Sequence, residues 1–216
     1  MRTENTSLGL DKVYRGEALG LISTIILILS TLALGIVGIG AASADTGVTL
    51  TEDVEAALGI SFLVVVLFIF AGLILALIGF IKQLKGFKQI GIDNSTFKTA
   101  FWFTIFCVVL TFSANILGEK VPFLATISDD ITSFLDVAVA YYVVKGCIEL
   151  FKDTPLEKSG RSLMKWVFAL GIARVLCNCL SGMKGGMVLI FGALELVITV
   201  IFYIFYLNYL SKAKDA

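Results

Sequence analysis

Three ionisable residues interrupt long apolar stretches of this chain: Asp136, Arg174 and Glu195. Inside a membrane, a charged side chain costs about 2.5–3.5 kcal/mol on insertion scales and normally needs a partner. An arginine offers five donors in a planar fork, so it can engage two carboxylates at once. The sequence therefore predicts a polar cluster at membrane depth, with Asn115 and Asp129 as further candidate members.

Such a cluster has two interpretations. In the structural one, the ion pairs form a buried polar core that fixes the register of the helices. In the functional one, the carboxylates line a path for protons, cations or a small polar solute. One arginine against two acids leaves one carboxylate unpaired, and a buried unpaired carboxylate can titrate near neutral pH. A proton-coupled step is then physically available.

The elements that position these residues follow from the composition. Of 216 residues, 58% are hydrophobic and 16% are charged, which is too apolar for a soluble domain of this size. A helix needs roughly 20 residues to cross a hydrocarbon layer of about 30 Å. Apolar stretches of this kind lie at residues 17–42, 57–81, 97–118, 121–151, 162–180 and 185–210. We expect an all-α, polytopic membrane helix bundle with six transmembrane helices in a single transmembrane domain.

Lysine and arginine are distributed unevenly over the connections between these spans. The basic connections include Lys82, Lys85, Lys88, Lys152 and Lys158, whereas the loop after the first span is acidic. Because basic loops are retained on the cytoplasmic side, we expect a plasma (inner) membrane protein with both termini in the cytoplasm. The same lysines predict contacts with anionic lipid head groups. Loops this short argue against nucleic-acid binding.

The first span leaves one alternative open. Residues 42–44 read Ala-Ser-Ala, which resembles the cleavage site of a secretory signal. The apolar run before this site is longer than the core of a usual signal peptide, so we interpret it as a true span.

The charged residues are expected at similar depths. By the helical rise, Arg174 lies about 16 Å from the cytoplasmic end of its span and Glu195 about 14 Å from the outer end of its own. Asp136 lies somewhat nearer the outside, within reach of a long arginine side chain. Asp129 shares the helix face of Asp136. Residues 121–128 could instead form an interfacial turn, with Ser128 capping the helix that follows.

A weak internal repeat relates residues 86–95 to residues 150–159 at an offset of 64 residues. The offset also aligns Trp102 with Trp166. It predicts a tandem helical-hairpin repeat, an arrangement that some transporters use to form a site between repeats. The alternative is that two membrane-hairpin loops resemble each other by composition.

Enzymatic chemistry has little support in the sequence. The chain has no histidine, which excludes zinc sites of the His-Glu-x-x-His type and nucleophiles activated by histidine. No glycine-rich phosphate loop or dinucleotide motif is present, and we expect no cofactor and no metal. Cys177 and Cys179 leave a membrane thiol oxidoreductase as an alternative, although their spacing differs from Cys-x-x-Cys.

These observations favour a non-enzymatic integral membrane protein with a buried Asp/Arg/Glu polar core. We expect a structural role, or an accessory role beside a membrane protein partner or in a homo-oligomer. The alternative is a small ion- or proton-coupled solute transporter or channel that uses the same residues.

Overall fold

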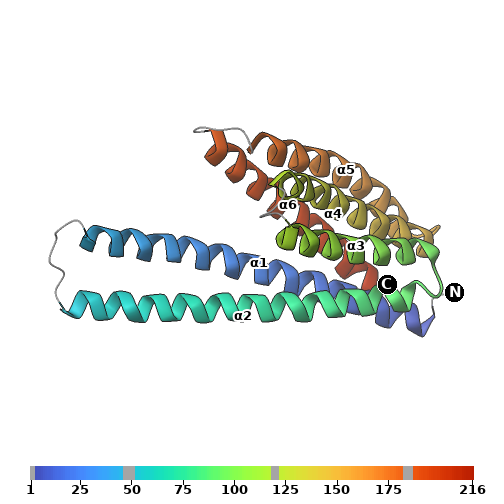
Figure 1. Ribbon diagram of the computed structural model, residues 1–216. Helices are drawn as coiled ribbons and strands as arrows, with labels where there is room; N and C mark the ends of the chain where they lie inside the picture. Colours follow the sequence, from blue (N-terminus) through green and yellow to red (C-terminus); the bar gives the residue numbers. More distant parts are fainter. Residues whose placement is uncertain (1–2, 46–51, 118–121, 182–186) are drawn as a thin grey trace. The chain divides into compact units, whose positions relative to one another are not determined.

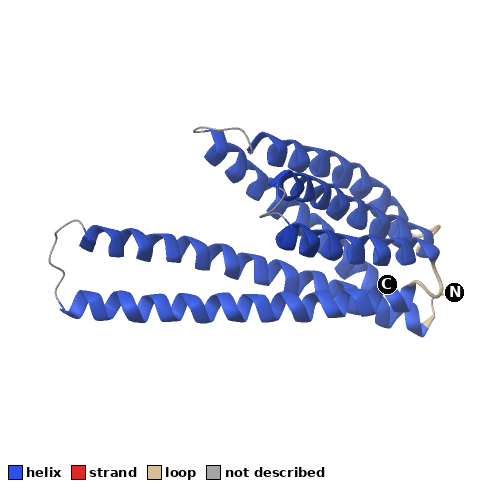
Figure 2. Ribbon diagram, viewed as in Figure 1, coloured by secondary structure: helices blue, strands red, loops and turns tan. Residues whose placement is uncertain are grey.

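The computed structural model describes residues 3–45, 52–117, 122–181 and 187–216, and every regular element in these ranges is an α-helix (Figures 1 and 2). In chain order the helices are α1 (Glu4–Asp45), α2 (Glu52–Ile90), α3 (Ser95–Leu117), α4 (Pro122–Leu150), α5 (Pro155–Ser181) and α6 (Met187–Asp215). Each helix covers all or nearly all of one predicted span. The predicted all-α fold class is therefore confirmed.

Membrane crossing is supported for most of these helices. Within the described ranges, α1, α2, α3, α4 and α6 each contain a segment that is long and apolar enough to span a bilayer. The chain is thus a membrane-type helix bundle. No such segment is found among the described residues of α5, which include Arg161, Lys165 and Arg174. The crossing of the membrane by residues 162–180 stays a prediction.

The first two helices are much longer than a membrane requires. α1 has 42 residues and α2 has 39, so they extend about 63 and 58 Å at the helical rise. The hydrocarbon layer is only about 30 Å thick. The polar start of α1 and the lysine-rich end of α2 therefore continue as helix beyond the predicted spans 17–42 and 57–81.

The described residues group into two compact units. The first unit contains Met1–Tyr14 and Leu84–Ala216, and the second contains Arg15–Gln83. The single transmembrane domain stays a prediction, since two such units can belong to one membrane-embedded domain.

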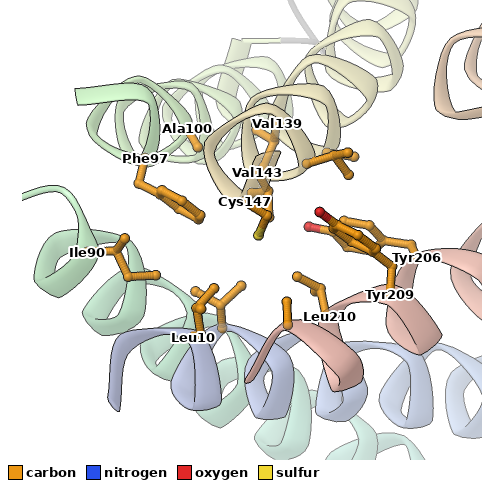
Figure 3. Close-up of a cluster of buried hydrophobic side chains, with 14 of the residues drawn as sticks. Leu10, Ile90, Phe97, Ala100, Val139, Val143, Cys147, Tyr206, Tyr209 and Leu210 are labelled. Atoms are coloured by element: carbon orange, nitrogen blue, oxygen red, sulfur yellow. The ribbon is translucent and has the colours of Figure 1, made fainter. Parts of the chain in front are cut away.

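The hydrophobic core of the first unit lies near the helix ends that carry Lys85, Lys88, Lys98 and Lys145, the lysine-rich ends. In this unit α3 packs against α4, α4 against α5, and α5 against α6. Figure 3 shows core side chains from α1, α2, α3, α4 and α6 pointing toward one another. The most completely buried members are Leu10, Val13, Phe87, Ile90, Phe97, Ala100, Val143, Val144, Cys147, Val167, Tyr206, Leu210 and Ala213. The beginning of α1 and the end of α2 therefore complete the core that α3 to α6 build.

Glycine permits one close contact in this core. A Cβ added at Gly146 of α4 would lie 2.4 Å from Cε2 of the Phe97 ring on α3. Only glycine leaves room for that ring, which is fully buried. The pair brings the lysine-rich halves of α3 and α4 close together.

Side-chain hydrogen bonds join the start of α3 to the end of α4. Asn94 caps α3, because its Oδ1 accepts a hydrogen bond from the backbone N–H of Thr96 at 2.8 Å. The Thr96 hydroxyl donates to Glu149 Oε2 at 2.6 Å, and Asn94 Nδ2 donates to the same oxygen at 3.2 Å. Glu149 thereby holds the first turn of α3 against α4.

The start of α5 is also capped. Thr154 and Glu157 have the spacing of a capping box, and Pro155 occupies the first helical position, where its missing N–H is not needed. Glu157 accepts hydrogen bonds from the backbone N–H of Asp153 at 2.7 Å and from Arg161 Nε at 2.8 Å. The Asp153 amide first, and then Arg161, hold the pKa of Glu157 below its usual range. Asp153 itself adopts a left-handed backbone with φ of 63°.

The two hairpins α2–α3 and α4–α5 have turns of equal length. Their helix ends correspond at an offset of 60 residues, whereas Trp102 and Trp166 correspond at 64. α5 therefore has four more residues before its tryptophan than α3 has. Four residues are close to one helical turn, so each tryptophan keeps the same helix face. The offset seen in the sequence aligns the apolar parts of α3 and α5 and not the turns.

The second unit is a hairpin of α1 and α2 with a glycine contact. A Cβ at Gly16 would lie 2.7 Å from the Gly79 carbonyl oxygen, and a Cβ at Gly79 would lie 2.8 Å from the Gly16 carbonyl oxygen. Such close backbone approach is typical of helix pairs in lipid. Beside this contact, Gln83 Nε2 donates to Glu17 Oε1 at 2.7 Å. Exposed apolar side chains of the unit include Leu29, Leu32, Leu63, Leu67 and Leu77. Such a surface is expected for a hairpin surrounded by lipid.

Candidate functional site

The three predicted charged residues come from three consecutive helices of the first unit. Asp136 lies in α4, Arg174 in α5 and Glu195 in α6. Asp136 is 11 residues from the buried Cys147, and Glu195 is 11 residues from the buried Tyr206. At the helical rise, each carboxylate therefore lies about 16 Å from that part of the core. The two acids are at matching levels, with α5 between their helices.

Arg174 lies close to both acids. Its Nη2 is 3.6 Å from Asp136 Oδ2, and its Nε is 3.6 Å from Glu195 Oε1. These are ion-pair distances, slightly longer than good hydrogen bonds. The Nε atom is buried, and it has no hydrogen-bond partner within the described ranges. A buried N–H in this state typically costs about 1–3 kcal/mol, so Arg174 retains capacity for another acceptor.

All three charges lie on the core-facing sides of their helices. Val139, Ala140 and Val143 of α4 are buried, and they lie three, four and seven residues after Asp136. Arg174 has the same kind of spacing to buried residues of α5. On α6, Phe202 and Tyr206 lie seven and eleven residues after Glu195. The buried neighbours of Arg174 are Val167, Gly171 and Cys177. The cluster thus continues the row of core positions away from the lysine-rich ends.

A glycine next to Arg174 explains how α5 approaches α4 at this level. A Cβ at Gly171 would lie 2.4 Å from Cγ1 of Val137 and 2.9 Å from Cγ2. Because Gly171 has no side chain, α5 can pack directly on Val137. Arg174 lies one turn further along α5, and Asp136 precedes Val137 in α4. The close contact therefore brings the guanidinium within range of the carboxylate.

The cluster is only partly shielded. The side chain of Arg174 is 22% exposed, that of Glu195 is 25% exposed, and that of Asp136 is 48% exposed. The formal charges of two carboxylates and one guanidinium sum to −1. A half-exposed carboxylate on a core-facing side, in a cluster with excess negative charge, can accept a proton, a cation or a cationic side chain.

The structure brings together only some of the candidate residues. Asn115 is exposed on α3, and no hydrogen bond or ion pair joins it to the charged cluster in the described ranges. Asp129 lies within α4, but its side chain is outside the part of the chain that the structure describes. The alternative of a turn capped by Ser128 is wrong, because α4 begins at Pro122. Proline fits the first helical turn, so no separate cap is needed at Ser128.

Thr132 is a neighbour of the cluster that the sequence reasoning missed. It lies four residues before Asp136, on the same side of α4. Its hydroxyl oxygen is buried and has no hydrogen-bond partner among the described residues. The spacing of four residues was the available signal. A single threonine in an apolar helix is common, so this spacing alone carried little weight.

The cysteines offer no second site in the described residues. Cys177 is a buried free thiol, and the side chain of Cys179 lies outside the described part. Among the described residues, no group of three or more histidine, cysteine or acidic side chains could hold a metal ion.

Comparison with known proteins adds no further constraint. No family model matches the chain, and no curated protein and no solved structure matches it.

Proposed function

We propose that the protein is a non-enzymatic, multi-span membrane protein in which Arg174 fastens α4, α5 and α6 together. The observation that supports this proposal is one guanidinium placed 3.6 Å from carboxylates on both neighbouring helices. Removing one member of a buried charge cluster leaves an uncompensated charge, which typically costs about 3–5 kcal/mol. The fastened bundle would serve a structural or accessory role beside a second membrane protein or a second copy of this chain.

A partner is suggested by the incomplete shielding of Asp136. Half of this side chain remains exposed, and an exposed carboxylate is costly where lipid surrounds it. A partner helix with a donor at that level would remove this cost.

The fastening role is tested by a double-mutant cycle on Arg174→Gln and Glu195→Gln, with thermal unfolding in detergent as the readout. Each single change is expected to destabilise strongly, and the double change is expected to be milder than the sum of the two. Two variants at exposed positions serve as matched controls. Lys152→Gln removes a positive charge, as Arg174→Gln does, and Glu4→Gln removes a negative charge, as Glu195→Gln does. Additive effects, or single changes no larger than the controls, would count against the proposal.

The second candidate function is proton- or cation-coupled movement of a small solute along the core-facing sides of α3 to α6. It is favoured by a specific observation: Asp136 lies on the core-facing side of α4 and is nevertheless half exposed. A dry structural ion pair would not need this access. The unpaired negative charge would then bind and release a proton or cation.

Transport is tested in proteoliposomes under a pH gradient. Proton flux through the wild-type protein and its loss in Asp136→Asn are the expected results, with Glu4→Gln as the control. If wild-type vesicles are no leakier than protein-free vesicles, or if Asp136→Asn conducts like wild type, the transport candidate is wrong. The double-mutant cycle separates the two candidates, because a path that admits water does not require strong coupling between the charges.

We also propose a plasma-membrane location with both termini in the cytoplasm. Support comes from the basic residues at the ends of α2 and α6 and between the end of α4 and the start of α5, and from the acidic residues between the first two spans. Exposed lysines at these ends, including Lys85, Lys88, Lys152 and Lys158, would contact anionic lipid head groups. Protease accessibility of tags at the two termini, in sealed vesicles of known orientation, tests this topology.

A further inference from the structure

Exposed lysine and tryptophan side chains occur together near the lysine-rich ends of α3 and α5. Lys98 and Trp102 lie four residues apart on one face of α3, and Lys165 precedes Trp166 in α5. The two tryptophans are 58% and 56% exposed. Tryptophan has an apolar ring with one polar N–H, and it is enriched where a membrane meets water. Exposure of both rings therefore points to contact with lipid at the head-group level.

The tryptophans occupy equivalent places in their helices. Fifteen residues separate each from the last residue of its helix, Leu117 in α3 and Ser181 in α5, which is about 22 Å at the helical rise. Beyond each tryptophan, both helices expose large apolar side chains. They include Phe106, Phe112 and Ile116 on α3 and Phe168, Ile172 and Leu176 on α5. The tryptophans thus mark the level at which acyl chains give way to head groups.

The lysines beside these tryptophans have no partner among the residues that the structure describes. Lys98 lies four residues before Trp102, about 6 Å nearer the lysine-rich end. Lys98 and Lys165 are both exposed, and neither forms an ion pair or hydrogen bond in the described ranges. Arg161, by contrast, pairs with Glu157 at 2.8 Å. The two ammonium groups are therefore available to an anion outside the chain.

We propose that Lys98 with Trp102 on α3, and Lys165 with the adjacent Trp166 on α5, form two binding sites for anionic phospholipid head groups. In each site the ammonium group contacts the head group, and the indole ring lies against the top of the acyl chains. The Trp102 ring is also in edge contact with Phe101, with ring centroids 5.5 Å apart. The two sites fix the depth of α3 and α5 in the membrane. This inference requires that α5 lies in the membrane as predicted, and it is independent of the role of the charged cluster.

Lipid titration with matched lysine variants tests the proposal. Phosphatidylglycerol is titrated into the full-length protein in phosphatidylcholine micelles, and bound lipid is counted by native mass spectrometry. The variants are Lys98→Gln, Lys165→Gln and their combination, and the control is Lys152→Gln combined with Lys158→Gln. The control removes the same charge from exposed lysines that have no adjacent tryptophan. Lys98→Arg combined with Lys165→Arg keeps the charge at the proposed sites.

The sites predict a specific pattern of binding. The attraction of one basic residue to an anionic lipid corresponds to about a fivefold change in affinity. Each single variant should therefore bind one of the two phosphatidylglycerol molecules about fivefold more weakly, and the combined variant should bind both about fivefold more weakly. The control removes lysines of the general basic surface, so it should lose only weaker additional binding and keep wild-type affinity for the two lipid molecules. The arginine variant should bind as wild type does. Unchanged melting in pure phosphatidylcholine would show that the variants fold.

Three outcomes would overturn the proposal. The first is equal loss in the control, which would mean that the basic surface binds lipid diffusely. The second is equal binding of phosphatidylglycerol and phosphatidylcholine by the wild-type protein. The third is full binding by the combined Lys98→Gln and Lys165→Gln variant.

Discussion

The contact between α4 and α5 beside the charged cluster can be perturbed by a single methyl group. In Gly171→Ala, the new Cβ would lie 2.4 and 2.9 Å from the two methyl carbons of Val137. Valine is branched at Cβ, so its methyl groups have little freedom to turn away. α5 must therefore move away from α4. The contact between Arg174 Nη2 and Asp136 Oδ2, already 3.6 Å long, would lengthen with it.

The magnitude follows from two opposing effects. Overpacking of a well-packed contact typically costs about 1–3 kcal/mol. Replacing glycine by alanine inside a helix favours the helix by about 1 kcal/mol. Gly20 provides the matched control, because a Cβ there would meet nothing within 4 Å. We expect Gly20→Ala to be neutral or stabilising, and Gly171→Ala to be about 1–3 kcal/mol less stable than that control.

Thermal unfolding in detergent measures the difference, with roughly 2–4 °C expected for each kcal/mol in a chain of this length. A suppressor sharpens the test, because Val137→Ala removes both methyl groups that the new Cβ would meet. The combined Val137→Ala and Gly171→Ala protein should recover most of the loss. If Gly171→Ala is as stable as Gly20→Ala, or if the suppressor restores nothing, the close packing of α4 on α5 is refuted.

Three further substitutions test other parts of the fold. Phe97→Ala empties a fully buried position in the core and should cost about 3–5 kcal/mol in chemical denaturation; a loss below 1 kcal/mol would contradict that core. Because the folded-state pKa of Glu157 is lowered, its stabilisation of α5 is present above the usual carboxyl pKa and is lost as pH falls through the lowered value. The protection factor of the amides in the first turn of α5, which corrects for the intrinsic pH dependence of exchange, should fall on acidification, and in Glu157→Gln it should be low at every pH; a wild-type protection factor that does not change with acid would contradict this. Gln83→Leu removes the hydrogen bond from Gln83 Nε2 to Glu17 Oε1, which is a bond to a charged group, and should destabilise the α1–α2 hairpin by about 1–3 kcal/mol; unchanged protease resistance of the hairpin would contradict this.

The sequence was sufficient for the number and type of helices but not for their full length. Hydropathy identifies the part of a helix that can lie in lipid, so the first span was predicted to begin at residue 17. The helix begins at Glu4, because Leu10 and Val13 pack in the core of the first unit. Lys12 and Arg15 masked this apolar pattern. A long-range contact of this kind is not visible in local composition.

The charged cluster was predicted because charge in an apolar stretch is costly and demands a partner. The free-energy cost of a charge in lipid and the depth of Asp136, Arg174 and Glu195 in their spans can both be read from the sequence. The sequence could not supply the exposed fraction of Asp136, which depends on how many helices surround it. The sequence also predicted Asn115 as a member of the cluster. In the described ranges, however, no hydrogen bond or ion pair links Asn115 to the three charged residues.

The half-exposed state of Asp136 has a physical reason in the construction of the first unit. At the lysine-rich ends, Leu10 of α1 and Phe87 of α2 help to cover the core-facing sides of α3 to α6. The first unit contains α1 only up to Tyr14 and α2 only from Leu84. Within the first unit, the level of Asp136 is therefore built from α3 to α6 alone. A carboxylate at this level needs a counter-charge from a neighbouring helix. α5 packs against both α4 and α6, so a long side chain from α5 can reach an acid on either side, and Arg174 does so. Asp136 and Glu195 therefore depend on the same cation, and loss of Arg174 should affect both neighbouring helices at once.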